Sequence, residues 1–351
     1  MTKLKIGVVG VGSISSFHLK SYAAHPDAEI VAVADINADR AQSVADKWGA
    51  KRAYGDAAEL FADPDVDAVS ICTWNDSHAE LAIQAVQAGK HVLLEKPMST
   101  SFAKADELGK VVEASDRVVQ MGFVRRHSAN CQVLKSFIDA GDLGDIYYAK
   151  AACIRRMGNP GGWFADKARS GGGPLIDIGV HVIDLAWYLM GSPKVASISG
   201  NTYDHLGNRA NITTFPRYTV SDYDPDKNDV EDMVNAAIRF ENGASLIMEA
   251  SFSLHTVKDH LGVSVHGTRG GADLEPLQIA TEQHGSMVNV EPQLRSNSFE
   301  LDPAFATEIG NFVDTCLGRA ESVAPAWHGV EIMKILDGIY ASADQKRELQ
   351  F

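Results

Sequence analysis

Asp177 and His181 form the pair of side chains whose types and spacing most directly indicate chemistry. They are four positions apart in a segment predicted to be helical, so both side chains lie on one helix face. A carboxylate one turn from an imidazole can orient the ring and raise its basicity. We therefore predict that His181 is a general base for a substrate hydroxyl, and that Asp177 orients it or contacts the substrate.

Lys96 is a second candidate, because it follows a predicted strand at the carboxyl edge of a sheet, where open α/β sheets bind ligands. Pro97 restricts the backbone here and with it the direction of the lysine side chain. A lysine in this place can hydrogen-bond a reacting hydroxyl and stabilise negative charge that develops on its oxygen. We predict that Lys96, Asp177 and His181 are catalytic and also bind the substrate.

Gly10 and Gly12 lie between the first predicted strand and the first predicted helix. There, Gly10 would make a tight turn, Gly12 would let the backbone approach a pyrophosphate, and the helix N-terminus would supply amide donors. The third position of this dinucleotide-binding pattern should be glycine or alanine, and here it is the small Ser15. Asp35 ends the second strand, where a carboxylate binds ribose hydroxyls and repels a 2′-phosphate, which favours NAD over NADP. Arg40 is close enough in sequence to soften that preference.

Two segments are more specific than these local signals: Thr73-Trp74-Asn75-Asp76-Ser77-His78 and Glu95-Lys96-Pro97. With the run GGGPLIDIGVH at 171–181, they resemble the glucose–fructose oxidoreductase / inositol dehydrogenase / MocA (Gfo/Idh/MocA) family of NAD(P)-dependent oxidoreductases. The resemblance continues through GFVRR at 122–126 and GTRGGA at 267–272, and so covers essentially the whole chain. The departures are Ser15, and Trp74 where the family usually has proline.

The resemblance implies a dehydrogenase that transfers a hydride between a nicotinamide and a secondary hydroxyl of a sugar, sugar derivative or inositol-like cyclitol. The cofactor implied is NAD, with NADP less favoured, and hydride transfer of this kind requires no metal. The residues expected to bind the cofactor are Gly10, Gly12, Ser13, Ile14, Asp35, Arg40, Thr73, Trp74, Asn75, His78, Glu95, Lys96 and Gln120.

Other residues carry weaker signals for substrate binding. Trp163 and Phe164 stand in a glycine-rich loop, where they would stack on a sugar or nicotinamide ring or else anchor the loop to the core. Arg126 and Arg155 belong to two basic pairs, Arg125-Arg126 and Arg155-Arg156, each of which would serve an anionic group or form surface ion pairs. We retain Trp163, Phe164, Arg126 and Arg155 as predicted substrate-binding residues.

The order of elements predicts two domains. Buried strands alternate with helices up to residue 123, which predicts a Rossmann-type, doubly wound parallel sheet over residues 1–123. From 124 to 351 a few helices accompany mostly strands, which predicts an α+β domain with an open, mostly antiparallel sheet for substrate binding and oligomerisation. Residues 204–230 are polar and are predicted to form a long loop, and two helices, about 303–318 and 327–345, are predicted to end the chain.

Composition limits the partners. The chain has 351 residues and a net charge of −14, which disfavours nucleic acid and anionic membranes as partners. The four cysteines have no metal or redox spacing, and no His, Cys, Asp and Glu cluster has metal-ligand spacing, so we predict no metal. No signal peptide or apolar run long enough to cross a membrane is present. We expect a cytoplasmic protein that forms a homodimer or homotetramer through its C-terminal sheet.

Two alternative functions remain open at this stage. A fold of this kind can hold NAD permanently and cleave a glycosidic bond through transient oxidation, without net NADH production. A non-catalytic sensor of nucleotides or sugars is a second alternative, which predicts loss of the catalytic residues, and here Lys96, Asp177 and His181 are all present.

Overall fold

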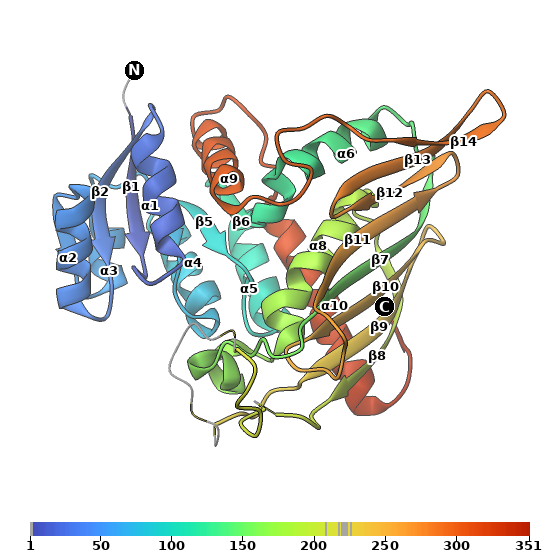
Figure 1. Ribbon diagram of the computed structural model, residues 1–351. Helices are drawn as coiled ribbons and strands as arrows, with labels where there is room; N and C mark the ends of the chain where they lie inside the picture. Colours follow the sequence, from blue (N-terminus) through green and yellow to red (C-terminus); the bar gives the residue numbers. More distant parts are fainter. Residues whose placement is uncertain (1–2, 208, 217, 219–223, 225–226) are drawn as a thin grey trace. The chain divides into compact units, whose positions relative to one another are not determined.

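The computed structural model describes residues 3–351 except 208, 217, 219–223 and 225–226 (Figure 1). The chain divides into two compact units. The first comprises Met1–His127 with Leu301–Met333, and the second comprises Ser128–Glu300 with Lys334–Phe351. A single boundary after residue 123, as expected from the sequence, does not include the return of the chain at 301–333 to the first unit.

The first unit is built on a six-stranded parallel sheet with the strand order β3-β2-β1-β4-β5-β6. This is the doubly wound order in which the chain changes direction between β1 and β4, so that the loops after these two strands leave a crevice at the carboxyl edge. Most strand residues are buried, as expected for a parallel sheet covered on both faces. The strands are β1 (Leu4–Val9), β2 (Ala28–Ala34), β3 (Arg52–Tyr54), β4 (Ala68–Ile71), β5 (His91–Glu95) and β6 (Val119–Gly122).

Helices connect these strands, and their ends follow local chemistry. Asn37, Asp56 and Ser101 cap helices by accepting a backbone amide hydrogen, and Gly89 turns the chain after a helix with a positive φ of 78°. The helices of this region are α1 (Ser15–Ala24), α2 (Ala38–Trp48), α3 (Ala57–Ala62), α4 (His78–Gln87) and α5 (Phe102–Glu113), with 3₁₀ turns η1 (Asn75–Ser77) and η2 (Val124–His127).

Helix α9 (Leu301–Cys316) belongs to the first unit although it follows the second in sequence. Phe305 of α9 stacks on Phe17 of α1 with ring centroids 5.1 Å apart, a pair that contributes about 0.5–1.5 kcal/mol beyond its buried area. Ile309 and Phe312 join the same apolar core as residues of β1 and β2. Sequence periodicity predicted this helix but not its partner, because periodicity shows which face is apolar and not what covers it.

The second unit has a nine-stranded, mostly antiparallel sheet in the order β14-β13-β12-β11-β7-β10-β9-β8-β15. One pair, β7 with β10, is parallel. The Asn242-Gly243 hairpin predicted between two strands joins β9 and β10, and Gly243 has a φ of 85°. The strands are β7 (Ile146–Ile154), β8 (Val195–Tyr203), β9 (Met233–Phe240), β10 (Ser245–Ser251), β11 (His260–Gly267), β12 (Gly270–Leu274), β13 (Leu277–Gln283), β14 (Ser286–Val290) and β15 (Leu349–Gln350).

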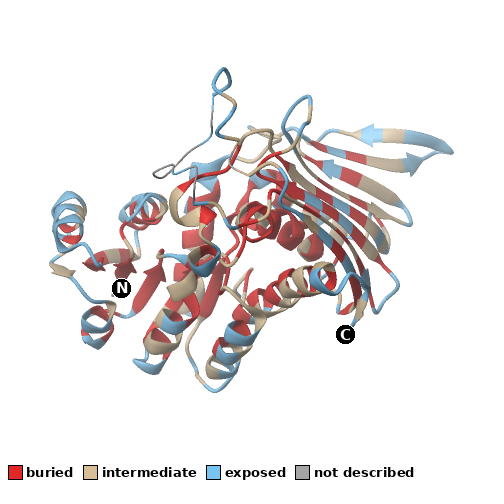
Figure 2. Cartoon of the chain, turned by 90° about the horizontal axis from the view of Figure 1, so that it is seen from below, coloured by how far each residue is buried: buried red, intermediate tan, exposed pale blue. Residues whose placement is uncertain are grey.

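Helices cover one face of this sheet, as Figure 1 shows for α8 (Val180–Leu189) and for the part of α10 (Ala326–Gln345) that belongs to this unit, from Lys334 onwards. Burial alternates along β9 and β10, so that the helix-covered face is apolar and the opposite face is half-buried or exposed. Figure 2 shows this alternation as red and pale blue bands along the strands. The remaining elements of this unit are α6 (Ala129–Asp139), η3 (Gly162–Ala165), α7 (Lys167–Ser170) and a π-turn, η4 (Leu175–Gly179).

Several short elements were not predicted from the sequence: β3, α3, β12, β13 and β15. β3 and β15 have only 3 and 2 residues, too few for a period of two to be visible. The predicted loop at 204–230 contains neither helix nor strand in its described residues after Tyr203, and part of it lies outside them. All four cysteines are free thiols. Among the described residues, no helix combines the length and apolar character of a membrane span.

His127 makes the folded chain sensitive to acid. Its side chain is buried, and neither ring nitrogen has a hydrogen-bond partner among the described residues. Burial, together with the charge of Arg126, lowers the pKa of His127 from 6.5 to about 3. Between these values the unfolded chain binds a proton that the folded chain does not. The contribution of His127 to stability is therefore intact above pH 6.5 and decreases as the pH falls towards 3.

We expect His127→Phe to remove this acid sensitivity, because a phenyl ring has a similar shape and no polar atom that needs a partner. Between about pH 7 and pH 5 the free energy of unfolding should fall by about 2 kcal/mol more in the unmodified protein than in the variant. Urea unfolding at the two pH values measures this difference. His205→Gln, at a side chain that is 78% exposed, is the control. An equal pH dependence in His127→Phe and the unmodified protein would contradict the argument.

Candidate active site

The first unit contains a pocket of about 570 Å³ at the carboxyl ends of β1, β2 and β4. This is where the strand order changes direction and where doubly wound sheets bind ligands. Six residues predicted to bind the cofactor line it: Gly10, Gly12, Asp35, Arg40, Thr73 and Trp74. Sequence reasoning missed the other residues that line it, which are Val9, Ala34, Ile36, Gly55, Asp56, Ala57, Cys72, Asp76, Ser77 and Leu81.

The glycine turn at the edge of this pocket depends on the two glycines in different ways. Gly10 has a φ of 81°, and a Cβ there would come within 2.8 Å of the carbonyl oxygen of Cys72, so a side chain does not fit. A Cβ on Gly12 would meet nothing within 4 Å, which leaves open space for a ligand to approach the backbone. The Ser15 hydroxyl donates to the Gly12 carbonyl at 2.7 Å. Serine at the third position therefore closes the turn rather than disrupting it.

Asp35 is a buried carboxylate at the end of β2 that faces the glycine turn. It accepts the amide hydrogens of Val11 at 3.0 Å and Asn37 at 2.8 Å, which ties the turn after β1 to the end of β2. Arg40 Nη1 lies 3.6 Å from Asp35, and its side chain is half exposed at the pocket. An acidic group beside an open glycine turn fits the adenosine ribose and pyrophosphate of a dinucleotide.

His78 and Glu95, predicted to bind the cofactor, are both buried, and their side chains hydrogen-bond backbone groups of the turn at Lys96-Pro97. His78 Nδ1 lies 2.7 Å from the carbonyl oxygen of Pro97, and Nε2 lies 3.1 Å from that of Thr73. Burial lowers the pKa of His78, so we assign a neutral ring whose proton is donated in the shorter contact, to Pro97. His78 thus connects the loop after β4 to the turn that carries Lys96.

Gln120 and Arg126, predicted to bind cofactor and substrate respectively, do not line the pocket and are almost fully buried. Gln120 donates to the Glu308 carbonyl and accepts from the Ser322 hydroxyl. Arg126 donates to the Val323 carbonyl at 2.9 Å and to His328 Nδ1 at 2.7 Å. Both side chains are engaged by the segment that returns at 301–333, and nothing in the local sequence indicates that segment.

Three other predicted residues lie close to the pocket's walls without lining it. Ser13 is exposed at the approach to α1, Ile14 packs against the apolar core of the unit, and Asn75 is buried in η1. Lys96 is half-buried immediately after β5, at the same carboxyl edge of the sheet as the pocket.

In the second unit, Asp177 and His181 stand out by their exposure. From Gly172 to Trp187 every residue is buried except these two, which are partly accessible. The predicted single helix is a π-turn, η4, that continues into α8, and π-turns of this kind are frequent at functional sites. Four residues make close to one turn in either geometry, so the accessible carboxyl and imidazole groups share one face of the helix.

Glu231 fixes the approach to this helix and was missed by sequence reasoning. Its carboxylate accepts the amide hydrogens of Gly173 at 2.9 Å and Leu175 at 3.2 Å, and the hydroxyl hydrogen of Tyr340 at 2.8 Å. A carboxylate at this position satisfies amides that the first turn of a helix leaves without partners. A Cβ on Gly172 would overlap the Tyr340 hydroxyl, which explains the glycine there. Burial, and then the charge of Glu231, raise the pKa of Tyr340 well above its ordinary value.

Trp163 and Phe164 are stacked on each other in η3, with ring centroids 3.9 Å apart, and both are partly exposed. Trp163 also lines a pocket of about 520 Å³ with polar residues including Asp166, Arg169 and Asp229. Arg155 instead folds back on its own loop, donating to the Gly158 carbonyl at 3.2 Å and lying 4.6 Å from the ring centroid of Tyr218.

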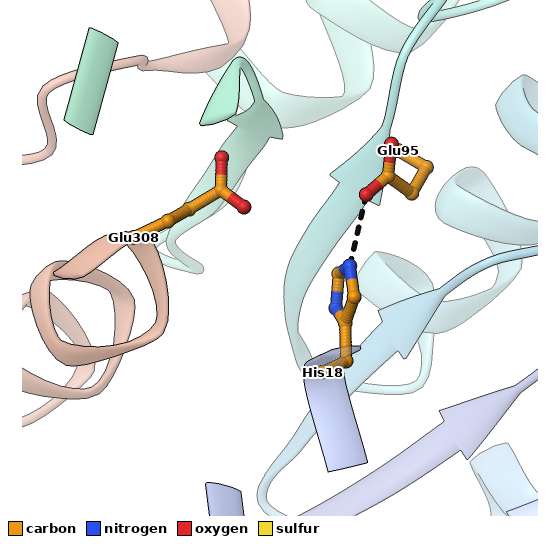
Figure 3. A group of neighbouring side chains, drawn as sticks. All are labelled: His18, Glu95 and Glu308. Carbon is orange, nitrogen blue, oxygen red and sulfur yellow. Dashed lines mark hydrogen bonds and ion pairs between the residues drawn. The ribbon is translucent and has the colours of Figure 1, made fainter. Parts of the chain in front are cut away.

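The fold also brings together three side chains that are distant in the sequence: His18, Glu95 and Glu308 (Figure 3). One nitrogen or oxygen atom from each lies within 4.8 Å of the others, and all three residues are buried. Sequence spacing predicted no such cluster, because its members come from α1, β5 and α9. The short contact within it, 2.8 Å between His18 Nε2 and Glu95 Oε1, is a hydrogen-bonded ion-pair distance.

Family models of known proteins match segments in both units. A model described as an oxidoreductase family with an NAD-binding Rossmann fold matches residues 4–123, and a GFO/IDH/MocA C-terminal domain model matches residues 131–273. D-glucoside 3-dehydrogenase of Escherichia coli (strain K12) is 31% identical over 344 residues, covering 97% of this chain and 95% of that protein. scyllo-Inositol 2-dehydrogenase (NAD(+)) of Bacillus subtilis (strain 168) is 29% identical and covers 88% of this chain and 82% of its own length.

A solved structure of levoglucosan dehydrogenase in complex with NADH and L-sorbose has the same fold, with a TM-score of 0.85 at 24% identity. The match covers 100% of this chain and 99% of that one. The predicted family, the parallel sheet with a second mostly antiparallel sheet, and NAD as cofactor are thereby confirmed. The chain belongs to the GFO/IDH/MocA family of oxidoreductases, whose N-terminal domain is an NAD-binding Rossmann fold.

Proposed function

We propose that the protein oxidises a secondary hydroxyl of a sugar, sugar derivative or cyclitol to a ketone, with NAD⁺ reduced to NADH and one proton released. The observation that carries this proposal is the accessible pair Asp177 and His181 in a helix whose other residues are buried from 172 to 187. Removal of a hydroxyl proton requires one positioned base, and a partly exposed imidazole with a carboxylate one turn away supplies it. Lys96, after β5, supplies a cation for the oxygen of that hydroxyl.

In this mechanism each side chain acts either on the dinucleotide or on the polyol. Bound NAD⁺ supplies the hydride acceptor. Asp35 and the glycine turn hold the dinucleotide, with Asp35 accepting from the ribose hydroxyls. Lys96 hydrogen-bonds the reacting hydroxyl and stabilises its oxygen as negative charge develops, His181 takes the hydroxyl proton, and Asp177 orients His181 or hydrogen-bonds the polyol. Trp163 and Phe164 we propose as an aromatic face for a sugar ring.

The substrate class rests on the names of two relatives. D-Glucoside 3-dehydrogenase and scyllo-inositol 2-dehydrogenase are named for a glucoside and a cyclitol, both of which present secondary ring hydroxyls. The alternative, glycoside cleavage through transient oxidation, uses the same groups and differs in its product, because it releases an aglycone without net NADH. One panel of glycosides, inositols, aldoses and anhydrosugars distinguishes the two.

The oligomeric state and the cellular location are two further proposals. We propose a homodimer or homotetramer formed through the face of the nine-stranded sheet opposite the helices, supported by the half-buried and exposed side chains along β9 and β10, Ile247 among them. The mass in solution, measured by light scattering, tests it. A cytoplasmic location is supported by the four free cysteines.

Removal of the proposed catalytic groups should abolish turnover. We expect Lys96→Ala and His181→Ala each to lower kcat by about 10²- to 10⁴-fold, because each loses a group that acts on the reacting hydroxyl. NADH formation at 340 nm on the polyol panel measures this. Lys104→Ala, at an exposed lysine of α5, is the matched control and should leave kcat unchanged. Unchanged kcat in both Lys96→Ala and His181→Ala would refute the assigned roles.

Asp35 should decide the choice between NAD⁺ and NADP⁺. We expect Asp35→Ser to raise the KM for NAD⁺ about tenfold or more and to lower that for NADP⁺, because the ribose loses an acceptor and a 2′-phosphate loses a repelling charge. Arg40, 3.6 Å away, would then contact the phosphate. Asp35→Ser/Arg40→Ala should therefore lose the gain for NADP⁺. If the ratio of the two KM values is the same in Asp35→Ser and the unmodified enzyme, Asp35 does not read the ribose.

A further inference from the structure

A buried hydrogen-bonded network lies directly behind the turn that carries Lys96. His18 of α1 and Glu308 of α9 are both 0% exposed, and Glu95 at the end of β5 is 6% exposed. Figure 3 shows the Glu95 carboxylate pointing towards the ring of His18, with the Glu308 carboxylate facing the same space. Neither His18 nor Glu308 lines the dinucleotide pocket, and neither has a role in the proposed mechanism.

The hydrogen bonds join this network to the backbone of Lys96. Glu95 Oε1 lies 2.8 Å from His18 Nε2, while Glu95 Oε2 accepts the amide hydrogen of Lys96 at 3.2 Å. On its other side, His18 Nδ1 lies 3.2 Å from the hydroxyl of Ser70, which is 2.8 Å from that of Tyr22. The imidazole is therefore held from both nitrogens, and it holds the carboxylate that holds Lys96.

Charge and packing both restrict the Glu95 carboxylate. Burial by itself raises the pKa of Glu95, but the hydrogen bond and charge of His18, and then the charge of Lys96, outweigh it and leave that pKa below its ordinary value. The carboxylate is therefore ionised and depends on His18 for its compensation. A Cβ on Gly122 would come within 3.2 Å of the Glu95 carboxyl carbon, so β6 closes the space on that side.

The other side of the same turn is held by His78. Its Nδ1 contacts the carbonyl oxygen of Pro97 at 2.7 Å, so the two residues next to Lys96 in sequence are each engaged by a buried histidine. Side chains on short loops are positioned only as well as their backbone is fixed.

We propose that His18, acting through Glu95, is a positioning residue for Lys96. It orders the carboxylate that accepts the Lys96 amide hydrogen, and so fixes the backbone position from which the Lys96 side chain extends. The proposal rests on the proposed function, in which Lys96 hydrogen-bonds the reacting hydroxyl. It assigns no contact with substrate or cofactor to His18.

The test compares two substitutions at His18. His18→Leu removes the hydrogen bond to Glu95, whereas the side-chain amide of His18→Gln can still donate to it. We expect kcat to fall about 10- to 100-fold in His18→Leu, because a displacement of about 1 Å at a reacting group has costs of this order. The KM for NAD⁺ should stay within about twofold, since His18 does not line the dinucleotide pocket, and His18→Gln should recover most of kcat.

His91 provides matched controls. It begins β5, the strand that Glu95 ends, and its Nδ1 accepts the Val118 amide hydrogen at 2.9 Å. His91→Leu and His91→Gln remove or alter an imidazole on β5 without involving Lys96, and kcat should be unchanged in both. Equal kcat values for His18→Leu and His91→Leu, or an equal fall in His18→Gln and His18→Leu, would overturn the proposal.

A second measurement does not depend on activity. Hydrogen exchange of the Lys96 amide, followed by NMR, should be faster in His18→Leu than in the unmodified protein and in His91→Leu, because the Glu95 carboxylate is no longer held. If none of the polyols in the panel supports reduction of NAD⁺ by the unmodified protein, the proposed function fails. Unchanged hydrogen exchange of the Lys96 amide in His18→Leu separately refutes the positioning role. A stoichiometric divalent ion in the purified protein that His18→Leu loses would also overturn it, since His18 would then be a metal ligand.

Discussion

Carboxylates that accept backbone amide hydrogens, two of them buried and one partly exposed, hold the loops from which the candidate site is built. Asp35 ties the turn after β1 to the end of β2, Glu95 holds the residue that follows β5, and Glu231 holds the approach to α8. A hydrogen bond to a charged acceptor is worth about 1.5–3 kcal/mol, which helps to offset the cost of burying the charge. Each of these acids holds backbone close to a residue with a role in the proposed mechanism: Asp35, itself assigned to the ribose, holds the glycine turn, Glu95 holds the amide of Lys96, and Glu231 holds the residues just before Asp177.

Close packing of the backbone imposes a second constraint in both units. Gly10 lies against the Cys72 carbonyl in the first unit, and Gly172 lies against the Tyr340 hydroxyl in the second. Any side chain at these positions would push apart two segments that must remain adjacent. Gly12 differs from both, because open space surrounds the position of its absent side chain. The glycines of one motif therefore have separate tasks: one permits packing within the protein, and another leaves room for a ligand.

The return of the chain at 301–333 changes the interpretation of several residues. Gln120 and Arg126 have polar side chains at positions that a two-domain reading of the sequence assigned to ligands, yet both bind backbone or side chains of this segment. The same segment supplies Glu308 to the network around His18. Conversely, no local motif distinguishes His18. It reaches the Glu95 carboxylate beside Lys96 because α1 and β5 pack in the same apolar core.

Sequence alone determined what depends on local order. The strand–turn–helix at Gly10–Ser15, the acid at Asp35 and the pair Asp177 and His181 are set by spacings of a few residues, and the alternation of strands and helices sets the parallel sheet. Only tertiary structure decided which groups hold these residues, because those partners come from other segments of the chain, as with Glu231 and Gly173, which are 58 residues apart. A hydrogen bond between distant segments leaves no periodic trace in either one. The sequence therefore indicated the residues proposed to act on a ligand, while the fold showed which groups hydrogen-bond the backbone beside them.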